Sequence, residues 1–290
     1  MRLASNKLQD IIGFYYTELG TVYNKNEIET LLNLSVGHYL GYSPRDIITR
    51  SGSNINQSAL IKLYDCCKDL KKNIPLQYIL NEAWFYKLKF SVDNHVLIPR
   101  PETEELVYII LKENRTPTSF LDVGTGSGCM AIAIKKNSNK SNVSACDVSP
   151  EALKIAHENA VNNHTEVTFI EADILQSGAL AKKAPESFGV ILSNPPYIQI
   201  SEKKTLEKQV VDQEPHLALF VEGNDPVIFY KKIIDFCKTG LDKKGKLYFE
   251  LNPLTAERVK AYAVQSGLFE EVKLIKDMSG NVRFLIATKF

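Results

Sequence analysis

A strand, a glycine-rich turn and a helix follow one another between residues 120 and 136, and this unit limits the possible folds more than any other part of the chain. The apolar residues 120–123 predict a short buried strand, and residues 129–136 predict a helix. The turn between them reads Gly124-Thr125-Gly126-Ser127-Gly128. Glycines let the backbone turn tightly and let a ligand approach it closely, while the free N–H groups of the helix's first turn face that ligand. We therefore expect a ligand-binding turn within an α/β fold.

Strand and helix patterns alternate downstream of this turn. Further strands are predicted at 143–146, 167–170, 188–193, 246–251, 272–275 and 283–288. Helices are predicted at 150–163, at 226–238 with Gly240 as its end, and at 254–266 with Gly267 as its end. This alternation is typical of a doubly wound, Rossmann-like α/β sheet, here with seven strands.

Two acidic residues follow predicted strands in positions that suit a nucleoside. Asp147 lies about 20 residues past the glycines, where a carboxylate can accept both ribose hydroxyls. Asp173 ends the next strand and can reach an adenine edge, with Ile174 beside the ring. A carboxylate at Asp147 is compatible with either NAD or S-adenosylmethionine. The dinucleotide fingerprint Gly-x-Gly-x-x-Gly would need its last glycine at position 129, where this chain has Cys129, and this argues against NAD. The alternative is a structural glycine turn with a helix-capping Asp.

The sequence Asn194-Pro195-Pro196-Tyr197 follows the predicted strand 188–193, at the ligand edge of an open α/β sheet. A planar amide or exocyclic amine is a poor nucleophile, because its lone pair is delocalised. The Asn194 side-chain carbonyl and the Pro195 carbonyl can accept both N–H groups of such a nitrogen, and the Tyr197 ring can pack flat against it. These residues predict methylation of a planar nitrogen. The alternative is a double-proline turn with a core tyrosine.

The N-terminal part predicts a separate small helical unit. Apolar residues recur there at helical spacing: Leu8, Ile11, Ile12, Tyr15, Tyr16 and Leu19, then Ile28, Leu31, Leu32 and Leu34, then Leu60, Ile61, Leu63, Tyr64 and Cys67. Alternation within residues 84–94 predicts a β-hairpin after it. We therefore expect a helical domain at 1–73, a β-hairpin linker at 74–98 and the α/β domain at 99–290.

The net charge and the cysteine content limit which functions and cellular compartments suit this chain. The formal net charge of +1 argues against direct nucleic-acid binding, which commonly needs a strongly basic domain. Five cysteines without a CxxC pair favour reduced thiols in the cytoplasm and no zinc site. No apolar stretch is long enough to cross a membrane, and residues 1–7 lead into an amphipathic helix rather than a signal sequence.

Four blocks together resemble the peptide chain release factor glutamine methyltransferases. They are Pro75-Leu76-Gln77-Tyr78-Ile79, Leu97-Ile98-Pro99-Arg100-Pro101-Glu102-Thr103-Glu104, Asp122 to Gly128, and Ser193-Asn194-Pro195-Pro196-Tyr197-Ile198. The resemblance implies methyl transfer from S-adenosylmethionine to the side-chain amide nitrogen (N5) of the glutamine in the Gly-Gly-Gln motif of class I release factors. It implies direct in-line displacement without a metal, and helical substrate recognition by residues 1–73.

The same resemblance implies roles for single residues. The cofactor-contacting positions are Gly124, Thr125, Gly126, Ser127, Gly128, Asp147, Asp173, Ile174 and Asn194. The substrate positions are Asn194, Pro195, Pro196, Tyr197, Arg100 and Glu102, of which Asn194, Pro195 and Tyr197 are catalytic. The chain departs from the family at Asn81, a usual glycine position, and around Glu250, which is interpreted as a buried or capping carboxylate.

Three other functions use parts of the same pattern. A nucleic-acid methyltransferase would hold the exocyclic amine of adenine (N6) or guanine (N2) in the same loop, but the near-neutral charge disfavours it. A nicotinamide dehydrogenase needs a hydride-transfer acid or base that cannot be assigned here. A non-catalytic binding protein would need a vestigial pocket, yet every candidate contact residue is present.

Overall fold

The computed structural model describes residues 5–184, 186–205 and 208–290, so the start of the predicted N-terminal segment, residues 1–4, lies outside it. The chain divides into two compact units, Met1–Glu82 with Lys208–Gln213, and Ala83–Glu207 with Glu214–Phe290. Each unit has its own buried apolar cluster. The helical and α/β parts expected from the sequence are therefore both present.

The first unit is built from helices. They are α1 (Leu8–Leu19), α2 (Lys25–Leu40), α3 (Pro44–Thr49), α4 (Gln57–Lys71) and α5 (Leu76–Leu80), and α10 (Lys208–Gln213) is counted with them. Asn24 and Ser43 begin α2 and α3 with capping boxes. The predicted apolar stripes mostly form the core, but Leu34 and Ile61 were wrongly included, being 54% and 52% exposed. Each lies two positions from a buried leucine, which is over half a turn around its helix.

Asn81 ends helix α5 in the left-handed conformation, with φ 52° and ψ 37°. Only glycine, and less readily asparagine, takes this conformation without a large steric cost. This geometry suits the glycine that the family resemblance leads us to expect here, and asparagine also tolerates it.

The second unit contains the predicted seven-stranded sheet, in the order β10-β11-β9-β6-β3-β4-β5. Its strands are β3 (Ser119–Val123), β4 (Asn142–Asp147), β5 (Thr168–Glu171), β6 (Phe188–Ser193), β9 (Leu241–Glu250), β10 (Phe269–Lys276) and β11 (Val282–Lys289). β11 pairs antiparallel with both of its neighbours, and the pairs around β3 and β6 are parallel. The Rossmann-like prediction is confirmed.

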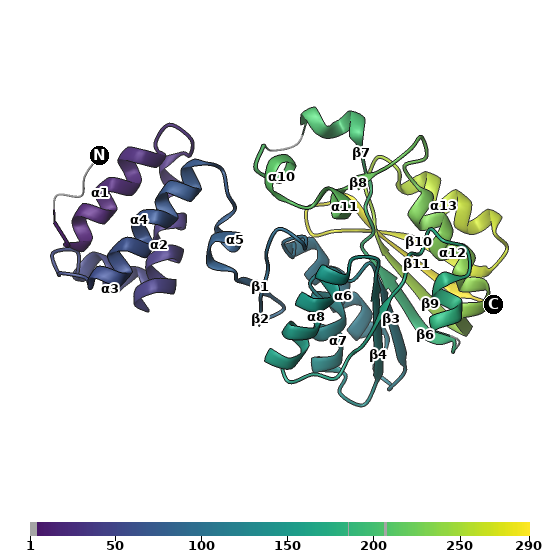
Figure 1. Ribbon diagram of the computed structural model, residues 1–290. Coiled ribbons are helices and arrows are strands. Elements are labelled where there is room, and N and C mark those ends of the chain that lie inside the picture. Colours follow the sequence, from purple (N-terminus) through teal and green to yellow (C-terminus); the bar gives the residue numbers. More distant parts are fainter. Residues whose placement is uncertain (1–4, 185, 206–207) are drawn as a thin grey trace. The chain divides into compact units, whose positions relative to one another are not determined.

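Helices cover both faces of this sheet (Figure 1). α6 (Pro101–Glu113), α7 (Cys129–Asn137) and α8 (Pro150–Asn162) lie along one face, and α12 (Ile228–Gly240) and α13 (Ala256–Gln265) lie along the other. The smaller elements are α9 (Ala179–Lys183), β7 (Ile198–Gln199), the 3-10 helix η1 (Ile200–Thr205), α11 (His216–Leu219) and β8 (Phe220–Val221).

Two helix ends behave differently from each other. Gly267 has φ +66° just past α13, which is the expected glycine end. Gly240 is the last residue of α12, so this helix also ends where predicted, but without the positive φ seen at Gly267. A Cβ atom at Gly240 would lie 2.3 Å from the Phe236 ring, so close packing requires the glycine.

A hairpin opens the second unit, formed by β1 (Ala83–Phe85) and β2 (Leu88–Phe90). Its two turn residues, Tyr86 and Lys87, both have positive φ. The side chain of Asn159 on α8 holds the chain after the hairpin: it accepts from Ser91 N and donates to Ser91 O and to Ser127 O. One amide thus joins the hairpin segment to the glycine turn.

The described helices include none that is both long and apolar enough to span a bilayer. All five cysteines are free and buried.

Candidate functional site

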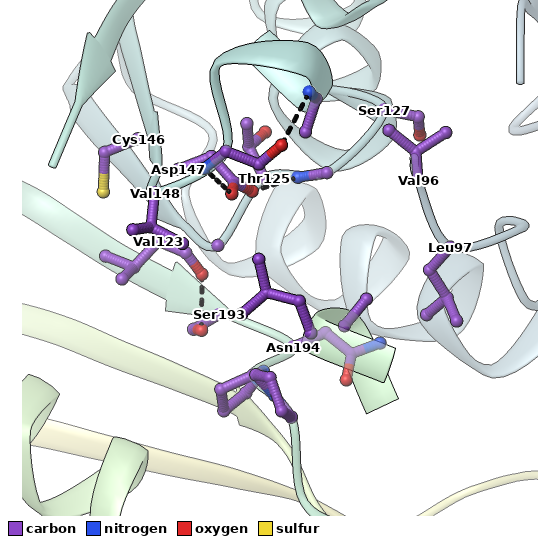
Figure 2. Close-up of a pocket in the computed structure, with 18 of the residues that line it drawn as sticks. Val96, Leu97, Val123, Thr125, Ser127, Cys146, Asp147, Val148, Ser193 and Asn194 are labelled. Carbon is purple, nitrogen blue, oxygen red and sulfur yellow. Dashed lines mark hydrogen bonds between the residues drawn. The ribbon is translucent and has the colours of Figure 1, made fainter. Parts of the chain in front are cut away.

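A cavity of about 290 Å³ opens at the carboxyl ends of β3 and β6 (Figure 2). The chain passes from β3 to β4 and β5 on one side of the sheet and returns to β6 on the other side. The crevice at such a change of direction is the usual ligand site of open α/β sheets. Its lining includes these predicted residues: Arg100, Gly124, Thr125, Gly126, Ser127, Asp147, Asp173, Ile174, Asn194, Pro195 and Pro196.

The glycine turn leaves β3 with three left-handed residues. Gly124, Gly126 and Gly128 have φ of +74°, +54° and +80°. A Cβ at Gly124 or Gly126 would meet nothing within 4 Å, so a ligand can approach the backbone there. A Cβ at Gly128 would lie 3.0 Å from Ile132 and 3.1 Å from Ala156, which places this glycine at a helix-packing contact outside the cavity lining.

Asp147 connects the end of β4 to this turn. Its Oδ2 accepts a 2.8 Å hydrogen bond from Gly126 N, and its Oδ1 accepts one of 3.0 Å from Ser149 N. Burial raises the pKa of Asp147, while the backbone hydrogen bonds act in the opposite direction. Each carboxylate oxygen has a second lone pair, so Asp147 can still accept ligand hydroxyls.

Asp122 lies beneath the turn and was not singled out in the sequence. The Thr125 hydroxyl donates to its Oδ2 at 2.7 Å, and its buried Oδ1 has no partner within the described structure. Burial raises the pKa of this carboxyl to about 7. The residue was missed because it sits inside an apolar strand pattern, where no spacing rule indicates an acid.

The second loop of the site begins at the end of β6. The Ser193 hydroxyl donates to Val123 O at 2.6 Å and ties this loop to the end of β3 (Figure 2). Asn194 Nδ2 donates to Thr103 Oγ1 at 3.3 Å, and that hydroxyl donates to Glu250 Oε2 at 2.7 Å. The sequence pattern did not predict this Thr103–Glu250 pair.

Three predicted site residues lie outside the cavity lining: Gly128, Glu102 and Tyr197. Tyr197 packs against the apolar cluster of the sheet, and burial raises its pKa to about 12. Arg100 does line the cavity, and its Nη2 donates to Glu214 Oε1 at 2.5 Å.

Much of the remaining lining is apolar and was missed by the sequence analysis. Val96 and Leu97 come from the segment after the hairpin, and Phe229 and Ile233 come from α12. These residues are far apart in the sequence, so only the folded chain shows that they share a cavity. No group of His, Cys, Asp or Glu side chains in the described residues is arranged to hold a metal ion.

Comparisons with known proteins agree with this architecture. The family model of the methyltransferase small domain matches residues 103–224. A release factor glutamine methyltransferase of Flavobacterium psychrophilum is 40% identical over 92% of this chain and 94% of its own length. Proteins of the same name from Bacteroides thetaiotaomicron and Bacillus subtilis are 37% and 32% identical, over 96% and 94% of this chain and 99% and 93% of their own lengths.

A solved structure shows the same fold. The crystal structure of a methyltransferase from Pyrococcus furiosus matches with a TM-score of 0.53 and 24% identity. The match covers 70% of this chain and 89% of that one. The α/β unit therefore has the fold of a known methyltransferase.

Replacing Gly128 by Ala should destabilise the protein more than replacing Gly124 by Ala. Both changes force an L-residue into a left-handed conformation, at about 1–2 kcal/mol. Only Gly128→Ala also overpacks a helix contact, which adds about 1–3 kcal/mol. Urea unfolding of the ligand-free variants measures the difference, and equal free energies of unfolding would contradict this account of Gly128.

Proposed function

This chain belongs to the release factor glutamine methyltransferases, and on that premise we propose that it methylates the side-chain amide nitrogen (N5) of the glutamine in the Gly-Gly-Gln motif of class I peptide chain release factors. One observation carries the residue-level proposal: the Asn194 loop and the glycine turn line the same cavity. A nitrogen held at the first would lie near a ligand bound at the second.

The cofactor proposed for the glycine turn is S-adenosylmethionine, in keeping with the methyltransferase family model. The open space above Gly124 and Gly126 suits the close approach of a ligand. Asp147 has free lone pairs for ribose hydroxyls, and Asp173 and Ile174 lie in the lining, where they can contact the adenine. When bound, this cofactor supplies an electrophilic methyl group on a positively charged sulfur.

The proposed acceptors for the substrate amide are Asn194 Oδ1 and the Pro195 carbonyl. Two carbonyl oxygens can take both N–H groups of a glutamine amide, which aims its lone pair at the methyl carbon. The apolar lining of the cavity excludes water from this reaction. A general base is not required, because the amide nitrogen becomes acidic once it is methylated. Pro196 and Arg100, which line the cavity, are proposed to complete the glutamine pocket, whereas Glu102 and Tyr197 lie outside the lining and are not assigned to it.

The remaining assignments follow from the substrate. The helical domain at 1–73 is proposed to recognise the release factor, and residues 74–98 are proposed to be the linker that joins it to the α/β domain. The proposal places the protein in the cytoplasm, and its five free cysteines support a reducing compartment. A nucleic-acid amino-methyltransferase is not favoured, because the relatives named above are release factor enzymes and the net charge is only +1.

Incubation of the protein with S-adenosylmethionine and a class I release factor should add one methyl to the Gly-Gly-Gln glutamine, located by peptide mass spectrometry. Asn194→Ala should lower the single-turnover rate about 100-fold or more, the effect of losing one well-placed polar group. The matched control is Asn162→Ala, which changes an exposed asparagine and should leave the single-turnover rate unchanged. Methylation of RNA or DNA without methylation of the release factor would overturn the substrate proposal.

Asp147→Ala should weaken S-adenosylmethionine binding roughly 10- to 100-fold, since hydrogen bonds to a charged group contribute about 1.5–3 kcal/mol. Titration calorimetry measures the affinity. Asp235→Ala, which removes an exposed acid on α12, is the control and should leave the affinity unchanged. An unaltered affinity in Asp147→Ala would remove this residue from the nucleoside site.

A further inference from the structure

The orientation of the Asn194 side-chain amide determines whether this residue presents a hydrogen-bond acceptor or a donor to a substrate. An asparagine presents a carbonyl oxygen on one side and an NH₂ group on the other. If the amide were turned over, its NH₂ group would face the NH₂ group of a glutamine, and two donors cannot bond. A residue that prevents this rotation therefore contributes to the reaction by holding the Asn194 amide.

The hydrogen bonds around Thr103 allow only one orientation. An ionised carboxylate accepts hydrogen bonds and cannot donate them, so Glu250 Oε2 takes the single hydroxyl hydrogen of Thr103, at 2.7 Å. Thr103 Oγ1 can then only accept from Asn194, at 3.3 Å, so Nδ2 must face Thr103. Within the described part of the chain, Asn194 Oδ1 accepts no hydrogen bond and is available to a ligand.

We propose that Thr103 and Glu250 are positioning residues, which hold the Asn194 amide so that its carbonyl oxygen faces the substrate nitrogen. This inference rests on the proposed function, because it concerns how the same loop receives a glutamine amide. It assigns a role to Glu250 beyond that of a buried or capping carboxylate.

The fold explains how three residues so far apart in sequence meet. β6 and β9 are parallel neighbours in which Ser193 pairs with Phe249, so Asn194 leaves β6 beside Glu250, the last residue of β9. Thr103 lies in the first turn of α6, after Pro101. Thr103 and Glu250 are 3% and 2% exposed, so water does not compete for their hydrogen bonds.

The arrangement depends on the charge of Glu250. Burial raises the pKa of this carboxyl to about 7, and the Thr103 hydrogen bond opposes that rise. Below this pH a protonated Glu250 can donate to Thr103, whose own hydrogen is then free for Asn194 Oδ1, and the amide can turn over. The rate of methyl transfer should therefore fall as the pH drops through about 7.

Other charged or titratable groups also act on Glu250. They are Arg100 and Glu102 at the start of α6, Cys129 on α7, Tyr197 after β6, Tyr230 on α12 and Arg283 on β11. Burial raises the pKa of Cys129 and of Tyr197 to about 12. Burial raises the pKa of Asp122 to about 7 as well, so the pH experiment must separate this carboxyl from Glu250.

The first experiment compares Thr103→Val with Thr103→Ser on a purified release factor. Thr103→Val keeps the shape and removes the hydroxyl, and it should lower kcat at least tenfold with less than a threefold change in the affinity for S-adenosylmethionine. Thr103→Ser restores the hydroxyl and should recover most of kcat. Thr165→Val, which removes a hydroxyl bonded to the Ala160 carbonyl away from the cavity, is the matched control. A wild-type kcat in Thr103→Val overturns the inference.

The second experiment measures kcat against pH for the wild type and for Glu250→Gln. Glutamine cannot ionise, so the decline below about pH 7 should disappear in this variant, whatever its absolute rate. A decline that persists unchanged in Glu250→Gln assigns it to another group, such as Asp122, and overturns the role of Glu250. This comparison also decides the matter if Thr103→Val does not fold.

A third measurement does not depend on turnover. The side-chain NH₂ resonances of Asn194, assigned by their loss in Asn194→Ala, should move on acidification of the wild type and should not move in Glu250→Gln. If the chemical shifts of these resonances do not change with pH in the wild type, the inference is contradicted. If the wild-type protein fails to methylate any release factor, the proposed function itself fails, whereas an active wild type with unaffected Thr103 and Glu250 variants refutes only the positioning roles.

Discussion

The parallel pairing of β3 with β6 is the constraint on which the rest of the site depends. Phe120 pairs with Val190 and Asp122 with Leu192, so the two strands end at the same level of the sheet. The Ser193 hydroxyl bond to Val123 O then joins the loops that follow them. A shift of register by two residues would separate the glycine turn from the Asn194 loop by roughly 6–7 Å, about twice the rise per strand residue. After such a shift, a ligand at the glycine turn would lie too far from a group held at the Asn194 loop.

Three carboxylates in or next to the cavity lining are satisfied in a similar way. Asp122, Asp147 and Glu250 are all largely removed from water, and burial raises the pKa of each. Asp122 accepts from the Thr125 hydroxyl, Asp147 from the N–H groups of Gly126 and Ser149, and Glu250 from the Thr103 hydroxyl on α6. An unpaired buried charge is costly, so each carboxylate needs its hydrogen-bond donors in place. The carboxylates therefore restrict the positions of the groups that donate to them.

The sequence was sufficient to predict those features that depend on local patterns. The seven strands, the glycine turn after β3 and the left-handed Gly267 all follow from residues close together in the chain. The Thr103–Glu250 contact could not be predicted, since it depends on the register between β6 and β9 and on the position of α6. The end of α12 at Gly240 was predicted, but its close contact with the Phe236 ring was not, because that contact depends on a side-chain position in the folded helix.

The side chain of Asn159 has a consequence for how the protein moves. Its single amide group bonds both backbone atoms of Ser91 and the carbonyl of Ser127. Opening either segment breaks a hydrogen bond of this shared amide, so the local stabilities of the segment after the hairpin and of the glycine turn are coupled. A ligand that rigidifies the glycine turn would therefore also reduce the backbone motion of the segment around Ser91, although it does not contact that segment.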